Sequence, residues 1–283
     1  MEFRVSNIRM AIDPETGEVD EDARVITKEM DEAITKNKAK NMSIAVDYAM
    51  YGQFYWLLYS IQKPLFDGLI DGSTATRLIY LATYMPYNGY RLTFDNNAGI
   101  HVGDLNKLLG LDRTNARRFL KKCKDAKLLF VNDDNTIDIS KEYFARGKIK
   151  PFLCKKERDI IRIYINSVRE LYEKSKEENY KALVYLFMLL PYVNKQYNCV
   201  CFNPNEEELE NIKPMTLQEC CDILGYNAKN AYRLRQFLFK IFVGNRPAIV
   251  LNRSAIGETV FVNPGVYYAG SRSEEVRILG AFN

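Results

Sequence analysis

Hydrophobic and polar positions follow the same order in two stretches of the chain. The first stretch begins at Leu78 with Leu-Ile-Tyr-Leu and reaches Pro86, and the second begins at Leu183 with Leu-Val-Tyr-Leu and reaches Pro191. Each continues with a segment ending in Leu-Gly, then with Asn-Ala-x-Arg, and ends in an aromatic-Ala tail. An ordered series of matches at two places predicts an internal repeat.

Each copy of the repeat predicts three helices followed by a β-hairpin. In the first copy we expect a helix that starts after Ser73 and Thr74 and ends at Pro86, helices over 102–109 and 112–127, a short strand over 91–94, and hairpin strands over 128–131 and 136–139. In the second copy we expect helices over 180–190, 216–224 and 227–242, with hairpin strands over 248–251 and 259–262. Three helices and a hairpin are typical of the winged helix-turn-helix.

The predicted fold is therefore mainly α with small β wings (α+β), with tandem winged helix-turn-helix domains joined by a linker helix. Ser73 or Thr74 would cap the first helix, Gly110 would end the second and Asp112 would cap the third. An apolar face predicts the linker helix over 156–178. That helix would pack the two copies together or against a second protomer.

The rest of the chain predicts smaller elements. Residues 2–19 predict a hairpin that turns at Asp13-Pro-Glu-Thr-Gly, and residues 43–66 predict an aromatic-rich helix that Pro64 ends. The expected boundaries are a hairpin and acidic arm at 1–42, the aromatic helix at 43–72, the first winged-helix domain at 73–150, the linker helix at 151–179, the second winged-helix domain at 180–270 and a tail at 271–283.

The third predicted helix of the first copy has an apolar side and a basic side. Ala116, Phe119, Leu120 and Cys123 share the apolar side, whereas residues 112–127 contain seven basic and two acidic residues, a balance of +5. The last helix of a helix-turn-helix enters the DNA major groove, which displays a distinct pattern of donors and acceptors for each base pair. This basic side is therefore the predicted DNA-contacting surface.

The second copy repeats the scheme with fewer charges. Ala231, Leu234, Leu238 and Ile241 share its apolar side. Asparagine and glutamine suit adenine edges and arginine suits guanine, so this copy would contribute more base contacts and the first copy more phosphate contacts. The predicted DNA-binding residues are Arg113, Thr114, Asn115, Arg117, Arg118, Lys121, Lys122, Lys229, Asn230, Arg233, Arg235, Gln236 and Arg253.

Other interpretations of these charges stay open. Basic helix faces are commonly only solvated, and the same scaffold also serves in protein–protein interaction. The basic run 141–158 would contact the DNA backbone or be a solvated linker. The acidic segment 13–32 would be a solvated arm or would mask a basic surface when DNA is absent.

Composition bounds the function. The net charge of +4 and pI of about 8.6 indicate only mild basicity, so the location of the charge must decide whether a nucleic-acid partner is indicated. A single histidine, His101, and the lack of a phosphate-binding loop motif argue against an enzyme. The cysteines at 199, 201, 220 and 221 do not follow a common zinc spacing, and reduced thiols are the favoured interpretation. We expect no cofactor, no metal, no membrane partner and a cytoplasmic location.

Short patches resemble RepL-type plasmid replication initiators, which are related to MarR-like winged helices. The first patch is residues 12–19, Ile-Asp-Pro-Glu-Thr-Gly-Glu-Val, and the second is residues 260–264, Val-Phe-Val-Asn-Pro, followed by Tyr268-Ala-Gly. The chain departs from that family in its two copies and its aromatic N-terminal segment. The resemblance implies a plasmid or phage origin and a role in replication initiation or transcription regulation.

Together these observations predict a sequence-specific protein that binds double-stranded DNA. Its candidate partners also include a second copy of the chain and the replication or transcription machinery. Two linked contacts would gain affinity through effective concentration, and binding would weaken with salt. The alternative is a scaffold for protein interaction, with a polymerase or replisome partner, that has no specific DNA binding.

Overall fold

The structure, a computed structural model, describes residues 11–12, 19–20, 32, 35, 52–61, 63–147, 158–175, 180–254 and 257–269. The chain forms two compact units, Met1–Asp47 and Tyr48–Asn283. In the first unit β1 (Ala11–Ile12) pairs antiparallel with β2 (Val19–Asp20). This pairing agrees with the expected hairpin, whose turn lies outside the described residues. The expected acidic arm, the tail at 271–283 and most of the basic run 141–158 also lie outside them.

A four-stranded antiparallel sheet lies at the centre of the second unit. Its order is β12-β7-β3-β6, with strands β3 (Phe54–Tyr59), β6 (Phe144–Ala145), β7 (Asp159–Tyr164) and β12 (Tyr267–Tyr268). The two inner strands pair over their full length, from Phe54 opposite Tyr164 to Tyr59 opposite Asp159. Strand β3 precedes the first copy and β6 ends it, and β7 precedes the second copy, which β12 ends. With these preceding strands, and the helix after β7, counted as parts of their copies, the sheet joins the two copies.

The predicted aromatic helix over 43–66 is wrong where the structure describes it, because β3 occupies its centre. The sequence of β3, Phe-Tyr-Trp-Leu-Leu-Tyr, is rich in the aromatic residues that favour strands. Tyr55, Leu57, Leu58 and Tyr59 are all buried, on both faces of the sheet. Burial on both faces removes the alternation that marks a half-buried strand, and the remaining apolar run is compatible with a helix.

The helices and hairpins of the two copies correspond in order. The first copy contains α2 (Gly72–Ala82), a short 3-10 turn (Val102–Asp104), α3 (Leu105–Leu109), α4 (Arg113–Asp125), β4 (Leu129–Val131) and β5 (Ile137–Ile139). The second contains α5 (Ile165–Ser175), α6 (Tyr180–Met188), α7 (Leu217–Ile223), a 3-10 turn (Ala228–Asn230), α8 (Ala231–Leu238), β8 (Phe242–Val243), β9 (Arg246–Pro247), β10 (Ile249–Ser254) and β11 (Gly257–Val262). The hairpins β4–β5 and β10–β11 confirm the predicted strand pairs.

The residues predicted to begin and end the helices are confirmed in part. Gly110 ends α3 in the left-handed conformation (φ 63°), and the Asp112 carboxylate caps α4, as expected. The expected caps of α2 are wrong, because Asp71 takes that position and accepts a hydrogen bond from the Thr74 amide. The expected strand over 91–94 is present only as isolated β-bridges.

The expectation of a mainly α protein with tandem winged helices and a linker helix is contradicted. The structure is an α+β fold, and residues expected to form the linker helix contain strand β7 before helix α5. The aromatic-Ala tails expected to finish each copy are the outer strands β6 and β12. The copies therefore share one sheet, and a single buried cluster runs through both of them.

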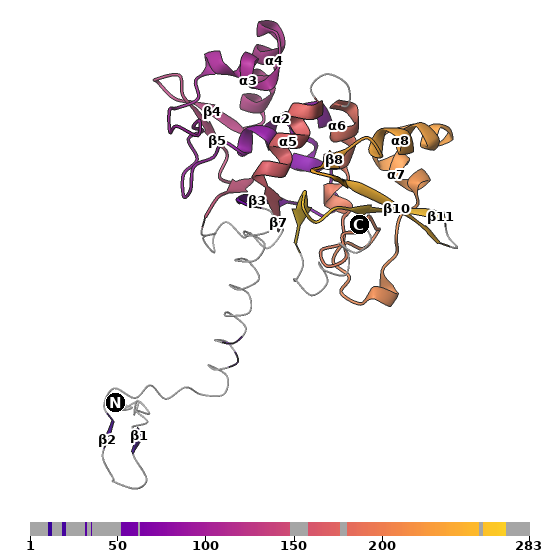
Figure 1. Cartoon of the computed structure of the whole chain (residues 1–283). Helices are drawn as coiled ribbons and strands as arrows, with labels where there is room; N and C mark the ends of the chain where they lie inside the picture. The colour runs from indigo at the N-terminus through magenta and orange to yellow at the C-terminus, as the bar shows by residue number, and fades with distance from the viewer. Residues whose placement is uncertain are drawn as a thin grey trace, which may run out of the picture. The chain divides into compact units, whose positions relative to one another are not determined.

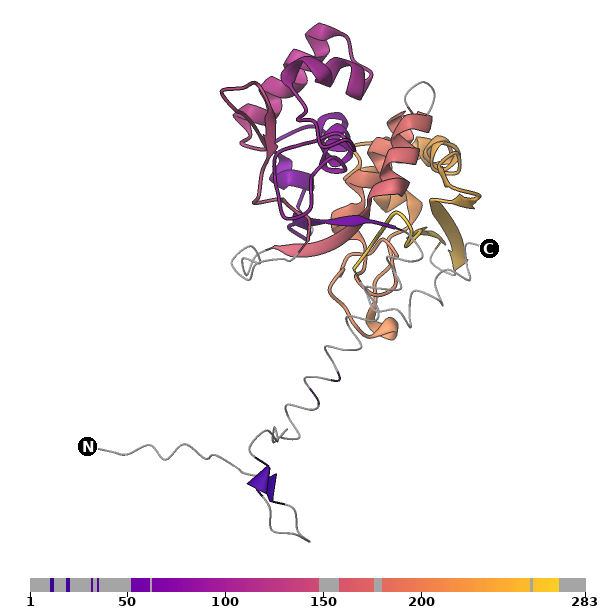
Figure 2. The same cartoon turned by 60° about the vertical axis from the view of Figure 1, so that its left-hand side comes forward.

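The helices lie on one side of the central sheet (Figure 1). Helices α2 and α6 pack against each other in the middle, with α3–α4 toward one end and α7–α8 toward the other, as the turned view also shows (Figure 2). Where the start of α2 meets the end of α6, a Cβ on Gly72 would lie 2.5 Å from the Met188 sulfur and 2.9 Å from Val184 Cγ1, so a larger residue requires these side chains to shift. Nearby, the Tyr80 and Tyr172 rings stack with centroids 3.9 Å apart.

We expect the second unit to unfold in one transition because both copies share its core. Leu81→Ala and Leu186→Ala each truncate a side chain with no exposed surface, and each should cost about 2–5 kcal/mol. Unfolding in urea is followed by the fluorescence of Trp56, the only tryptophan, and by far-UV circular dichroism. Within each variant the two probes should give the same midpoint. Leu209→Ala, at an exposed site, is the control and should change stability by less than about 0.5 kcal/mol. A Leu186→Ala protein whose two probes separate would show that the copies unfold independently.

Candidate nucleic-acid interface

Helix α4 separates an apolar side from a charged side. Ala116, Phe119, Leu120 and Cys123 are buried, which confirms the predicted inward positions. The helix begins after Asp112, whose carboxylate accepts hydrogen bonds from the backbone amide of Asn115 at 2.9 Å and from its side-chain amide. The amide hydrogen bond is the main reason that the pKa of Asp112 is lowered. The charged cap and the buried side together fix how the basic side chains are presented.

The outward side of α4 is cationic and largely unpaired. Arg113, Thr114, Arg117 and Lys121 are all exposed, as predicted. Lys121 forms a 3.4 Å ion pair with Asp125, one turn further along the helix. Among the described residues, Arg113 and Arg117 have no ion-pair or hydrogen-bond partner. The described part of the chain therefore leaves these charges available to an external anion.

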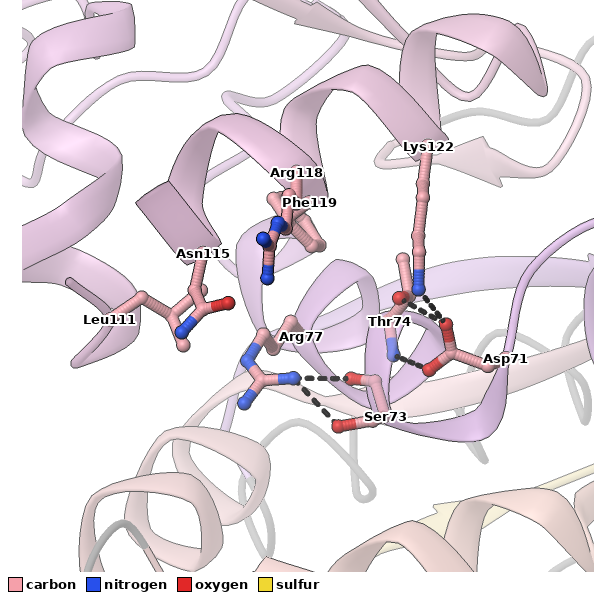
Figure 3. A pocket seen from close by; sticks show the side chains of 9 residues that line it. All are labelled: Asp71, Ser73, Thr74, Arg77, Leu111, Asn115, Arg118, Phe119 and Lys122. Atoms are coloured by element: carbon pink, nitrogen blue, oxygen red, sulfur yellow. Dashed lines mark hydrogen bonds and ion pairs between the residues drawn. The ribbon is translucent and has the colours of Figure 1, made fainter. Parts of the chain in front are cut away.

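Three of the predicted residues turn from this side toward α2. Asn115, Arg118 and Lys122 line a pocket of about 480 Å³ between the two helices (Figure 3). The other lining residues are Asp71, Ser73, Thr74, Arg77, Leu111 and Phe119. Helical spacing predicts Arg118 and Lys122 at the edges of the basic side, and in the structure these two edge residues line the pocket while Arg113, Arg117 and Lys121 face outward.

Asp71 is the acidic centre of this pocket. Its carboxylate accepts hydrogen bonds from Lys122 Nζ at 2.6 Å, from the Thr74 amide at 2.9 Å and from Thr74 Oγ1 at 2.8 Å. Burial raises the pKa of Asp71, but these hydrogen bonds outweigh that effect and lower it to about 2. One carboxylate thus caps α2 and ties it to α4, a role that the sequence analysis missed. The spacing Asp71-x-x-Thr74 was the available signal, since Asp is a preferred N-cap.

The second copy presents a different surface. Lys229, Asn230, Arg233 and Gln236 are exposed, as predicted, and their side chains have no partner among the described residues. Tyr232 lies among them with 67% of its surface exposed. This large exposed aromatic side chain was not among the predicted contacts.

The other two predicted residues of the second copy bind an acidic side chain instead of lying free. Arg235 lies 3.6 Å from Glu258, and Arg253 donates to the same carboxylate at 3.1 Å. The Arg235 guanidinium also lies over the Phe239 ring, 5.1 Å from its centroid. Glu258 therefore reduces the positive charge that the second copy offers to a ligand.

The structure does not gather the predicted residues into one site. Those of the first copy lie on α4, and those of the second lie on α8, the turn before it and strand β10. The two groups lie on opposite sides of the central α2–α6 pair (Figures 1 and 2). A ligand that contacts both groups must extend across that pair.

The remaining candidates for chemistry are buried or dispersed. Cys199, Cys201, Cys220 and Cys221 are buried free thiols. Within the described ranges, no group of three or more His, Cys, Asp or Glu side chains is placed to hold a metal ion. No helix in that part of the chain is both long and apolar enough to cross a membrane.

Comparisons of the chain with protein-family models, with curated proteins and with solved structures gave no match. The resemblance to RepL-type initiators therefore stays a prediction. The residues 13–18 and 270 that contribute to it lie outside the described part of the chain.

Replacing Asp71 tests the link between α2 and α4. Asp71→Asn keeps an oxygen that can cap the helix but removes the charge that attracts Lys122. Because the pKa of Asp71 is lowered on folding, its ionised form stabilises the protein above about pH 4, and this contribution is lost as the pH falls toward 2. The variant should be less stable at pH 7 by under about 1 kcal/mol, as for a solvent-screened pair.

Urea unfolding of both proteins at several pH values measures this effect. The difference in unfolding free energy should shrink between about pH 4 and pH 2. Asp71→Ala should lose the cap as well, at a further cost of about 0.5–2 kcal/mol. A difference between wild type and Asp71→Asn that stays constant with pH would argue against the ion pair.

Proposed function

We propose that the protein binds double-stranded DNA and that the outward face of α4 makes the main contact. The observation that carries this proposal is the set of exposed arginines, Arg113 and Arg117, that have no acidic partner in the described part of the chain. Lys121 and Lys124 are exposed on the same helix. Exposed cations along one helix neutralise DNA phosphates and release their counterions, which favours binding.

The dimensions of α4 suit this role. An α-helix fits the B-DNA major groove, and arginine can donate two hydrogen bonds to a guanine edge. The buried side of the helix, held by Phe119 and Cys123, fixes its rotation so that Arg117 and Thr114 point outward. Base contacts would come from these outward side chains, and phosphate contacts from the flanking ones.

The second copy would make a weaker and chemically different contact. Asn230 and Gln236 suit adenine edges, whereas Glu258 neutralises part of the charge of Arg235 and Arg253. Two unequal surfaces at opposite ends of the α2–α6 pair fit an asymmetric DNA site. Within this proposal the protein acts as a transcription regulator or replication initiator of phage or plasmid origin in a bacterial cytoplasm.

A second candidate is a protein-interaction scaffold, and the aromatic residues of the second copy favour it. Tyr232 and Phe242 are 67% and 43% exposed, and Phe239 at the end of α8 is 36% exposed. Aromatic side chains are enriched in protein interfaces. Under this alternative the chain would bind a polymerase or replisome subunit and would show no specific affinity for DNA.

Neutralising the α4 face tests the DNA proposal. We expect the double variant Arg113→Gln/Lys121→Gln, which removes two flanking cations of the α4 face, to lower the magnitude of the slope of log affinity against log salt by about 2, since each phosphate contact contributes about 0.9. Fluorescence anisotropy with duplexes selected from genomic fragments gives this slope. Lys213→Gln, an exposed lysine outside both helices, is the matched control and should leave the slope unchanged.

The same assay separates the candidate functions. If wild-type protein does not bind any duplex at low salt, the DNA-binding proposal fails and the protein-interaction function is the remaining candidate. Unchanged binding by the α4 double variant would instead move the contact away from α4. Asn230→Ala should weaken cognate more than scrambled DNA, whereas Lys121→Ala should weaken both equally.

A further inference from the structure

The pocket between α2 and α4 has more cationic than acidic side chains in its lining. Its lining includes Arg77 from α2 and Arg118 and Lys122 from α4, against the single carboxylate of Asp71. This leaves an excess of two positive charges on a cavity of about 480 Å³. Cations from two helices are thus held close together, which is unfavourable unless an anion lies between them.

The three cations differ in how they are used. Lys122 pairs with Asp71 at 2.6 Å. One terminal nitrogen of Arg77 donates to Ser73 Oγ at 2.7 Å, and its guanidinium lies over the Tyr180 ring, 4.5 Å from the centroid. Arg118 has no hydrogen bond or ion pair with any described residue. Arg118 therefore has all its donors available, and Arg77 is held in place.

Both arginines line the same cavity, one from each helix. Arg118 extends from α4 toward α2, and the Arg77 guanidinium lies beyond it, turned toward Ser73 (Figure 3). The carboxylate of Asp71 lies at the other side of the view, bound by Lys122 and Thr74 (Figure 3). No acidic side chain of the lining lies between the two guanidinium groups.

We propose that this pocket binds a phosphate group between Arg77 and Arg118. Guanidinium groups bind phosphate through paired N–H donors, and two of them on one oxyanion offset its double charge. The Ser73 hydroxyl, which accepts from Arg77, retains its own proton to donate. The phosphate can come from a free ester or pyrophosphate, or from the backbone of a nucleic acid that reaches the pocket from the outward face of α4.

Two adjacent arginines of α4 supply the test and its control. Arg118→Gln removes a cation that lines the pocket, and Arg117→Gln removes an exposed cation one residue away that does not line it. Neither side chain has a partner to lose within the described residues, so both variants should fold. Resonances of the arginine Nε–H groups, assigned with the Arg77→Lys and Arg118→Gln proteins, report binding at the pocket directly.

In the first arm wild-type protein is titrated with inorganic phosphate and with pyrophosphate at constant ionic strength set by chloride. We expect saturable shifts of the Arg77 and Arg118 Nε–H resonances. Arg118→Gln should weaken binding at least about tenfold, as for a lost charged hydrogen bond, and Arg117→Gln should change it less than about twofold. If both variants weaken the affinity for phosphate equally, the effect comes from the general positive charge of α4 and not from the pocket, and the proposal is overturned.

In the second arm a short DNA duplex replaces the phosphate. Shifts of the Arg77 and Arg118 resonances here, without shifts in the first arm, identify the DNA backbone as the source; the reverse identifies a free phosphate. The absence of shifts at both residues in both arms overturns the proposal. Because the first arm contains no DNA, its result does not depend on whether the proposed DNA-binding function holds.

Discussion

The antiparallel pairing of β3 with β7 is the constraint on which the rest of the structure depends. It joins the first strand of one copy to the first strand of the other, and each of these strands pairs on its far side with the last strand of its own copy. Helices α2 and α6 pack against each other and contact the sheet, where Tyr55 of β3 donates to the Ile79 carbonyl of α2 and Tyr267 of β12 donates to the Leu186 carbonyl of α6. The distance between α4 and α8 is consequently set by a packed core and not by a linker.

This arrangement gives two similar frames different chemistry. Helix α4 has four buried apolar positions and α8 has three, with Ile241 buried just after its end, and both helices present polar side chains outward. In the first copy Asp71 and Asp125 each hold one lysine, and the three arginines of α4 have no acidic partner among the described residues, whereas in the second Glu258 holds two arginines. The acidic residues around each helix therefore determine how much positive charge the helix presents to a ligand, because an arginine already paired with a carboxylate binds a second anion more weakly.

Patterns confined to a single helix were predictable from the sequence. The buried positions of α4 and α8, the cap at Asp112 and the left-handed Gly110 all follow from local chemistry. The strand β3 and the central sheet were not predictable, because burial on both faces removes the periodicity that marks a strand. Nor was the pocket, since Arg77 and Arg118 are distant in the chain and only the packing of α2 against α4 brings them together.

The central sheet also determines the order in which the chain can fold during synthesis. β3 can pair with β7 only after about a hundred further residues have left the ribosome, and β12 completes the sheet at the far end of the second copy. Until then the apolar strand β3 has an unpaired edge, which is prone to associate with other chains. A nascent first copy therefore cannot be a finished domain, and any helper that shields exposed strand edges would act during this interval.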